Sequence, residues 1–194
     1  LRTGTKLSVV IPSHLFEGVS VWAPLPDNNL CISGGLDSGS ACKELVHIMP
    51  SKDFVVLNKS PMLTERFYHA VAYSKGFLYA IGGTNMRGAI AECERYSIDE
   101  DQWAPLPPLL KAVYGSSAVL VENTQKVYVL GGNERNRAIQ ELNLKENLWK
   151  TLDFPLPYVA RNIAAFSEGS VVYLIQKSSL YALDIEGNQF RLIK

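Results

Sequence analysis

Hydrophobic residues along this chain fall in short runs separated by polar, turn-forming segments, and three of the runs end at a pair of glycines. The runs cover 30–33, 78–81 and 127–130, and the pairs that follow are Gly34-Gly35, Gly82-Gly83 and Gly131-Gly132. The first glycines of these pairs lie 48 and 49 residues apart. Such a regular interval predicts a repeat protein whose units each span about 50 residues.

A second landmark recurs in step with the glycine pairs. A large apolar side chain opens another short run 17 to 20 residues after each pair, at Phe54, Trp103 and Trp149. Extending the register to both ends adds Leu7 and Phe190, and the successive intervals are then 47, 49, 46 and 41 residues. Two features that keep the same spacing identify the repeat more firmly than either feature alone.

The unit in the middle of the chain predicts four short strands and no helix. Its hydrophobic segments cover 69–73, 77–81, 92–98 and 102–106, with turn residues between them. The next unit repeats this order over 115–121, 126–130, 138–144 and 148–152. The last unit, from about Asn162, keeps the strands but has Gln176 and Lys177 where the glycine pair is expected. This loss indicates a degenerate or terminal unit.

These positions together resemble the kelch motif. In the best unit the pair Gly82-Gly83 is followed by Tyr96 and then by Trp103, with prolines just beyond. The resemblance covers most of residues 30–194 and implies an all-β fold, the kelch-type β-propeller. About four blades and one extra N-terminal strand are expected. Since kelch proteins commonly close with five to seven blades, this number favours part of a larger propeller.

We expect the blades at approximately 12–62, 63–110, 111–157 and 158–194, with a strand at 6–11 that belongs to a preceding or closing blade. The first blade is ambiguous because 22–26 repeats the letters of 103–107, where the neighbouring blade has its fourth strand. Trp22 lies only 12 residues before Gly34, which leaves no room for a first strand between them. Aligning Gly18 with Gly115 instead makes 19–22 the first strand, and we favour this alignment.

Two residue types in the repeat are predicted to serve packing. Glycine is expected where positive φ is needed or where a side chain would crowd the neighbouring backbone. Tryptophan suits the gap between adjacent sheets. The predicted structural residues are Gly34, Gly35, Gly82, Gly83, Gly131, Gly132, Trp103 and Trp149.

Composition narrows the functional classes. The 194 residues hold 19 Lys and Arg against 19 Asp and Glu, so no global field favours nucleic acid or an anionic membrane. Cys31, Cys42 and Cys93 form no CxxC pair, which predicts a reducing, cytoplasmic setting. The three histidines fit no ligand spacing, so neither a metal nor a cofactor is expected. Nucleophile-elbow and phosphate-loop motifs are absent from the sequence, and we do not expect an enzyme.

The resemblance implies that two families of loops share one face of the propeller: those after the second strands and those between blades. We align Tyr68, Tyr114 and Arg161 at equivalent positions, and Tyr and Arg are common in protein-binding surfaces. Cationic residues outnumber acidic ones in these loops, which favours an acidic segment of another protein as the partner. The predicted partner-binding residues are Arg66, Tyr68, Arg87, Tyr114, Arg135, Arg137 and Arg161. The alternative is that these are ordinary solvated charges.

The sequence therefore predicts a non-enzymatic protein-interaction module: a scaffold, an adaptor or a substrate-recognition propeller. Two alternatives stay open. One is a structural subunit of a large assembly, and the other is a metal-free carbohydrate-active enzyme that uses Glu, Arg and His. A copper-radical oxidase, an activity found in some propellers of this kind, is disfavoured because it needs clustered Tyr and His ligands.

Overall fold

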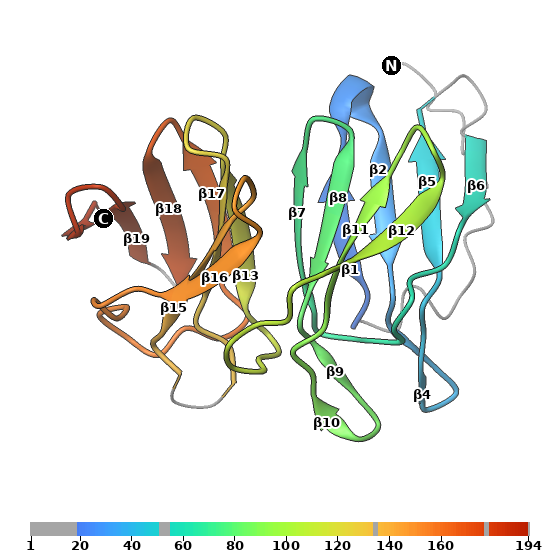
Figure 1. Ribbon diagram of the computed structural model, residues 1–194, viewed down its shortest axis with the longest axis horizontal. Coiled ribbons are helices and arrows are strands. Elements are labelled where there is room, and N and C mark those ends of the chain that lie inside the picture. The colour runs from blue at the N-terminus through green and yellow to red at the C-terminus, as the bar shows by residue number, and fades with distance from the viewer. Residues whose placement is uncertain (1–18, 51–54, 134–135, 177–178, 194) are drawn as a thin grey trace, which may run out of the picture.

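In the computed structural model, the described residues are 19–50, 55–133, 136–176 and 179–193, and they form four antiparallel sheets of four strands each. Each sheet is one blade, and the blades follow one another in chain order around a common axis (Figure 1). Among the described residues the one helical segment is the short 3-10 turn Pro26–Asn28. The observed architecture is the all-β propeller arrangement that the repeat predicts.

Within every blade the strands lie side by side in the order in which they occur along the chain. Blade 1 contains β1 (Val21–Pro24), β2 (Leu30–Ser33), β5 (Leu45–Met49) and β6 (Val55–Lys59). Blade 2 contains β7 (Ala70–Ser74), β8 (Phe77–Ile81), β11 (Cys93–Ser97) and β12 (Gln102–Leu106). Blade 3 contains β13 (Ser117–Val121), β14 (Lys126–Leu130), β15 (Ile139–Asn143) and β16 (Leu148–Thr151). Blade 4 contains β17 (Ala164–Glu168), β18 (Val171–Gln176), β19 (Ser179–Asp184) and β20 (Gln189–Leu192).

Two short hairpins follow the first two glycine pairs. They are β3 (Leu36–Asp37) with β4 (Ser40–Ala41), and β9 (Thr84–Asn85) with β10 (Gly88–Ala89). The segments that join successive blades, 60–69, 107–116 and 152–163, lie at the same end of the molecule as these hairpins (Figure 1). We call this end the linker face.

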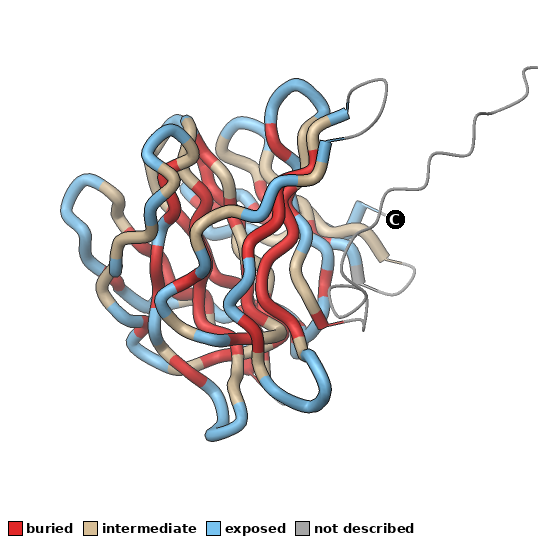
Figure 2. Tube along the Cα trace, turned by 90° about the vertical axis from the view of Figure 1, so that its right-hand side faces the viewer, coloured by how far each residue is buried: buried red, intermediate tan, exposed pale blue. Residues whose placement is uncertain are grey.

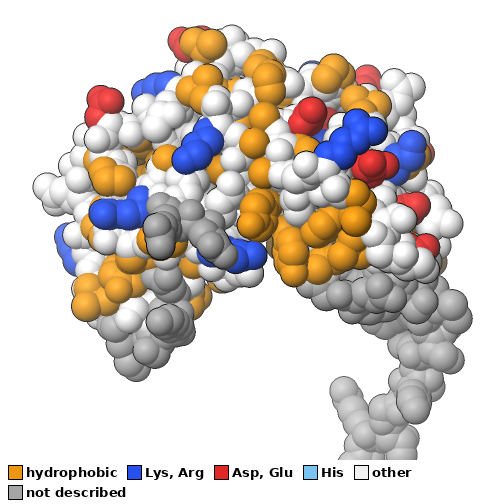
Figure 3. Space-filling view, turned by 90° about the horizontal axis from the view of Figure 1, so that it is seen from below, with side chains coloured by type: hydrophobic (Ala, Val, Ile, Leu, Met, Phe, Trp, Pro, Cys, Tyr) orange, Lys and Arg blue, Asp and Glu red, His pale blue; other side chains and the backbone are white. Residues whose placement is uncertain are grey.

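The first strand of each blade lies nearest the axis. β7 lies between β1 and β13, and β13 lies between β7 and β17. The four blades form an arch that is open between blades 1 and 4. Figure 3 shows this arch from the linker face, with hydrophobic side chains gathered beside the opening.

The predicted strands agree with the structure most closely in blade 2. The segments 77–81 and 102–106 coincide with β8 and β12, whereas 69–73 and 92–98 differ from β7 and β11 by one residue at each end. The hairpins β3–β4 and β9–β10 were expected as loops. The expected strand at 6–11 and the landmark Phe54 lie outside the described residues.

The same five residues, Trp-Ala-Pro-Leu-Pro, occupy different places in blades 1 and 2. Trp103 lies in the outermost strand of blade 2, whereas Trp22 lies in the innermost strand of blade 1. β1 pairs with β2 across a turn in which Asp27 and Asn28 adopt positive φ. The placement of this segment in a first strand is therefore confirmed, although the strand begins at Val21. The alternative fourth-strand interpretation is wrong because pairing with the next strand, and not local sequence, decides the position.

The hydrophobic core lies between neighbouring blades, and the second and third strands are the most buried (Figure 2). In β14 every residue from Val127 to Leu130 is at most 2% exposed. Tyr128 and Leu130 pack with blade 4, whereas Val127 and Val129 pack with blade 2. A central blade must therefore be apolar on both faces, which explains the uninterrupted hydrophobic run in its sequence.

Trp103 and Trp149 attach the outer strand of their blade to the end of the preceding blade. The indole N–H of Trp103 donates to the carbonyl of Ser60, and that of Trp149 donates to the carbonyl of Pro107, each at 2.8 Å. In blade 4 Phe190 packs edge-on against Phe154, with ring centroids 6.4 Å apart. Because phenylalanine has no donor, a ring contact replaces the hydrogen bond at this junction.

The glycine pairs hold the linker that leads into the following blade. The backbone N–H groups of Gly83 and Gly132 donate to the carbonyls of Val113 and Ala160, each at 2.7 Å. The glycine before each has positive φ, 58° at Gly82 and 65° in blade 3. A Cβ on either would lie less than 3.0 Å from the same carbonyl oxygen. Both the backbone angle and the close approach therefore require glycine.

Candidate functional site

Backbone geometry defines which linker residues are equivalent. Positive φ occurs at Tyr68, Gly115 and Asn162, with values of 52°, 63° and 50°. The residues before them, Phe67, Tyr114 and Arg161, are therefore equivalent. The expected alignment of Tyr68 with Tyr114 and Arg161 is wrong by one residue. The turn between β13 and β14 is two residues longer than the turn between β7 and β8, so a fixed count back from the glycine pairs does not find equivalent linker residues either.

Arg66 lies in the protein interior. Its side chain is 0% exposed, and its Nη2 donates to Glu94 Oε1 at 2.6 Å. Its Nη1 donates to the carbonyls of Gly82 and Glu92, at 2.6 and 2.8 Å. A guanidinium whose donors are used inside the fold does not reach a partner. The structure therefore removes Arg66 from the predicted partner-binding surface and assigns it to the junction of blades 1 and 2.

The partner of Arg66 also fixes the linker. The carboxylate of Glu94 accepts the backbone N–H groups of Leu63 and Thr64, at 2.6 and 3.2 Å. In blade 3 the amide of Gln140 accepts the N–H of Lys111 and donates to its carbonyl, both at 3.0 Å. Both side chains tie a linker to the third strand of the next blade, one with a charge and the other with a neutral amide.

Tyr114 and Arg161 form a pair across the linkers before blades 3 and 4. The guanidinium carbon of Arg161 lies 5.2 Å from the ring centroid of Tyr114, which is within cation–π range. Arg161 is exposed, and Tyr114 is half-buried. The backbone N–H of Tyr114 donates to Asn133 Oδ1 at 2.7 Å, which holds the main chain that carries the ring. The pair thus presents a cation on an aromatic support at the linker face.

The structure does not bring the other predicted binding residues into this pair. Arg87 is exposed between β9 and β10, and Arg137 is exposed with its Nε donating to the Leu156 carbonyl at 2.5 Å. Tyr68 is half-buried against Phe67, with ring centroids 5.5 Å apart. Arg135 lies outside the described residues.

A central channel runs between the first strands. Two adjoining cavities, of about 330 and 290 Å³, are lined by β1, β7, β13, β17 and the residues just before them. All of these lining residues are uncharged. Trp22 and Phe166 are 45% and 50% exposed. The channel is therefore mainly apolar, and the smaller cavity lies next to the linker face.

His69 and Ser116 are the polar residues that directly precede β7 and β13 in this smaller cavity. His69 Nε2 forms a 2.9 Å hydrogen bond with Ser33 Oγ. Burial and the neighbouring Arg66 cation hold the pKa of His69 well below its ordinary value, so the ring is neutral at pH 7. Sequence reasoning considered the histidines as metal ligands or as residues of a carbohydrate-active enzyme, and it overlooked Ser116. The linker register, which makes them equivalent, is the signal that could have found both.

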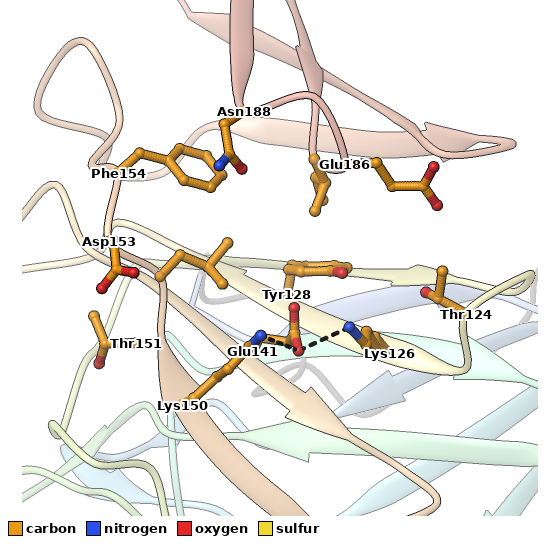
Figure 4. Close-up of a pocket in the computed structure, with 12 residues that line it drawn as sticks. Thr124, Lys126, Tyr128, Glu141, Lys150, Thr151, Asp153, Phe154, Glu186 and Asn188 are labelled. Carbon is orange, nitrogen blue, oxygen red and sulfur yellow. Dashed lines mark ion pairs between the residues drawn. The ribbon is translucent and has the colours of Figure 1, made fainter.

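A second cleft, of about 300 Å³, lies between blades 3 and 4 (Figure 4). Lys126 and Lys150 approach the same Oε1 of Glu141, at 3.1 and 3.2 Å, and this carboxylate is almost fully buried. Burial and the Glu141 carboxylate raise the pKa of Tyr128 beside it. The two lysines thus compensate the buried charge, while Glu186 lies on the opposite wall. The ion pairs that line this cleft all lie within blade 3, so they are best explained as structural compensation of the buried Glu141 charge.

The described part of the chain gives little support for a metal site or a reactive cysteine. No group of three or more His, Cys, Asp or Glu side chains there could hold a metal ion. All three cysteines are buried and unpaired. Burial is the main cause that raises the thiol pKa to about 11 for Cys42 and Cys93, and to about 12 for Cys31. Such thiols stay protonated at neutral pH and are poor nucleophiles.

Comparison with known proteins identifies the repeat. Residues 65–110 match the family model described as the Kelch motif. Over 192 residues the chain is 25% identical to human Kelch-like protein 23, and the aligned region covers 94% of this chain and 34% of that protein. It is 26% identical over 174 residues to mouse Kelch-like protein 35, covering 79% and 29% of the two chains. The solved structure of YjhT matches with a TM-score of 0.72 at 16% identity, covering 91% of this chain and 65% of that one.

The fold is that of a β-propeller built from kelch repeats. The chain carries a kelch motif at residues 65–110 and is similar to Kelch-like proteins along most of its length. It spans about a third of the length of the Kelch-like relatives that it matches. None of the helical segments in the described ranges is long and apolar enough to cross a membrane.

Proposed function

We propose that this propeller is a non-enzymatic protein-interaction module that binds its partner through the linker face. The kelch motif at residues 65–110 and the similarity to Kelch-like proteins support an interaction role. The blades are occupied with packing against one another, whereas linkers and hairpins can vary without disturbing that core. The linker face is therefore the surface on which a binding function can be placed.

The observation that carries this proposal is the pair of Tyr114 and Arg161. Aromatic and arginine side chains dominate the binding energy of many protein interfaces because they offer large contact areas and several donors. Here the tyrosine ring is held by the linker, and the guanidinium lies over it at 5.2 Å. Such a pre-positioned side chain loses less conformational entropy on binding than a free surface arginine.

The charges of the linker face support an acidic segment as the partner. The exposed cations Lys111, Arg137 and Arg161 lie in the loops around blades 3 and 4. Lys and Arg side chains outnumber acidic ones on the left of Figure 3. Around blades 1 and 2 the cation Arg87 is mixed with acidic Asp37 and Glu65. We therefore place the acidic segment over blades 3 and 4, where charge-assisted hydrogen bonds are available.

Exposed side chains on blade 4 support completion of the ring by further blades. Phe166 and Ile175 are 50% and 45% exposed, and Phe166 stacks on Tyr173 with ring centroids 5.0 Å apart. A permanent role within a larger assembly is the second candidate, because the same apolar side chains could be covered by another subunit. The blade boundaries and the assignment of 6–11 to a further blade stay predictions. The buried thiols agree with a reducing, cytoplasmic setting, which also stays a prediction.

Charge reversal at the linker face tests the interaction role. We expect Arg161→Glu to reduce partner recovery at least tenfold in quantitative affinity purification from cells that express the protein. Lys145→Glu makes the same charge change in the exposed turn between β15 and β16, away from the linker face, and serves as the control. Equal recovery of all partners by Arg161→Glu, the control and the wild type would contradict the proposal.

A further inference from the structure

Two exposed leucines occupy equivalent positions in successive linkers. The residues just before them, Met62 and Leu109, are 1% and 4% exposed. Each donates its backbone N–H to a carbonyl two residues before the third strand of its blade, β5 or β11, so the two linkers share one register. The residues that follow, Leu63 and Leu110, are 56% and 63% exposed. The linkers therefore bury one apolar side chain and direct the next one into solvent.

The backbone that carries these leucines is held by the following blade. The N–H of Leu63 donates to Glu94 Oε2 at 2.6 Å. Directly after Leu110, the N–H and the carbonyl of Lys111 both bond to the side-chain amide of Gln140, at 3.0 Å. Glu94 and Gln140 are each 2% exposed. Because the backbone is already fixed at both places, contacts made by these leucines cost less conformational entropy than contacts made by a mobile loop.

The hairpin β9–β10 adds a third exposed apolar side chain on the same face. Thr84 exchanges two backbone hydrogen bonds with Phe67 in the linker to blade 2, each at 2.9 Å. Just beyond β10, the carbonyl of Ala91 accepts the N–H of Leu109 in the linker to blade 3, also at 2.9 Å. The hairpin is thus attached to both linkers, and it projects at the linker face (Figure 1). Met86, in its turn, is 65% exposed.

Packing within the propeller does not explain why these side chains are apolar. They belong to the linkers into blades 2 and 3 and to the hairpin of blade 2, and both of these blades already have a blade on either side. Further blades would pack beside blades 1 and 4, at the opening of the arch. Large apolar side chains that gather on one face in this way are typical of protein interaction sites.

The charges beside these side chains indicate what they bind. Lys111 directly follows Leu110 and is exposed, and Arg161 lies further towards blade 4. A purely acidic segment would contact the cations and leave the apolar side chains in water. A segment that carries large apolar residues next to acidic ones can cover the first group and pair with the second. Methionine suits such a surface, since its flexible side chain adapts to differently shaped partners.

We propose that Leu63, Met86 and Leu110 form an apolar docking surface for large apolar side chains of the bound protein segment, next to the cations that bind its acidic residues. The inference rests on the proposed function and names the second half of the recognised sequence. The segment then carries an apolar block over blade 2 and an acidic block over blades 3 and 4.

Selection of peptides from a random display library on the immobilised chain tests this surface. Selected peptides should share large apolar residues on one side of a run of Asp or Glu. Leu110→Ser should weaken binding of the best peptide at least fivefold, because the apolar area that it buries is lost. Replacing the apolar residues of that peptide by Ser should weaken binding to the wild type but have little further effect on Leu110→Ser.

Leu148→Ser is the matched control, because Leu148 is also 63% exposed but begins β16 at the end of the blade away from the linker face. This control should bind the peptide as the wild type does. Since both leucines are exposed, neither substitution should change the melting temperature by more than about 2 °C.

The outcomes separate this inference from the proposed function. Acidic peptides without a shared apolar block, or peptides that bind Leu110→Ser as tightly as the wild type, would overturn the apolar surface alone if Arg161→Glu still abolishes their binding. Equal losses in Leu110→Ser and Leu148→Ser would also overturn it. A library from which no peptide is selected would contradict both the surface and the proposed interaction role. A shared apolar block whose effect disappears only in Leu110→Ser would support both.

Discussion

Blades 2 and 3 tie their linkers to their third strands with one geometry and two chemistries. In blade 2 the carboxylate of Glu94 binds two linker N–H groups and a fully buried Arg66. In blade 3 Gln140 makes two hydrogen bonds with the linker, and Val113 takes the place of the arginine. Arg66 and Val113 occupy equivalent positions, because the carbonyl of each accepts the backbone N–H of the second glycine in the glycine pair of the preceding blade.

This difference shows that the kelch architecture does not require a buried ion pair at every junction. The neutral amide in blade 3 satisfies the same backbone groups without desolvating a charge. The ion pair of blade 2 instead makes its two members dependent on each other, because either one alone would be a buried uncompensated charge. Stability at the blade 1–blade 2 junction should therefore respond to single substitutions far more than to the paired substitution.

The largest effect is expected from separating this ion pair. Glu94→Gln alone should lower the free energy of unfolding by about 3–5 kcal/mol, because Arg66 stays charged inside the fold. Arg66→Val combined with Glu94→Gln copies blade 3 and should recover most of that loss. Urea unfolding of both single variants and the double variant measures the coupling. Additive losses in the double variant would contradict the equivalence of the two junctions.

A smaller effect is expected at the tryptophans of the outer strands. Trp103→Phe and Trp149→Phe each remove one indole hydrogen bond and should lower stability by about 1 kcal/mol. For a chain of this size that corresponds to a melting temperature about 2–4 °C lower. Calorimetry of the two variants should give similar shifts, since both bonds measure 2.8 Å. Phe190→Trp in blade 4 makes the reverse substitution at the equivalent position. A large loss of stability in only one of the two tryptophan variants would contradict the proposed equivalence of their hydrogen bonds.

An effect confined to acidic pH is expected from titration of His69, for which blade 3 has Ser116. The folded pKa of His69 lies well below its ordinary value of 6.5, so the unfolded chain binds a proton that the folded chain excludes. This residue's contribution is fully present above about pH 6.5 and is lost as the pH falls below that value. Unfolding free energies at pH 5 and 7.5 should therefore differ less in His69→Ser than in the wild type. An unchanged difference would show that His69 does not titrate in this way.

Much of the fold follows from the sequence because its signals are local and repeat. The uncharged run 127–130 and the glycine pairs predict strand positions to within a residue or two, since both faces of β8 and β14 are buried. The hairpin β9–β10 was not predictable, because strands of two residues have no hydrophobic periodicity. The place of Trp22 in a first strand was inferred from its distance to Gly34 and not from its own motif.

The candidate site was harder to predict because it depends on loop length and burial. Arg66 and Arg161 read alike in the sequence as linker cations, yet one is 0% exposed and the other is exposed. Nothing local distinguishes them, since the acceptor that buries Arg66 is Glu94, 28 residues further along the chain. The alignment of Tyr68 was wrong by one residue, and distances from the glycine pairs could not correct it because the first hairpins of blades 2 and 3 differ in length by two residues. Only the positive φ of the linkers restores the register.

The most direct test of the account compares the two linker arginines in one experiment. Arg66→Ala and Arg161→Ala are each measured for thermal unfolding and for binding to the partner recovered by the wild-type chain. We predict that Arg66→Ala lowers the melting temperature by about 6 °C or more, whereas Arg161→Ala changes it by less than about 3 °C and loses at least tenfold in affinity. Full binding by Arg161→Ala, or destabilisation by it equal to that of Arg66→Ala, would contradict the division between a structural and a partner-binding arginine.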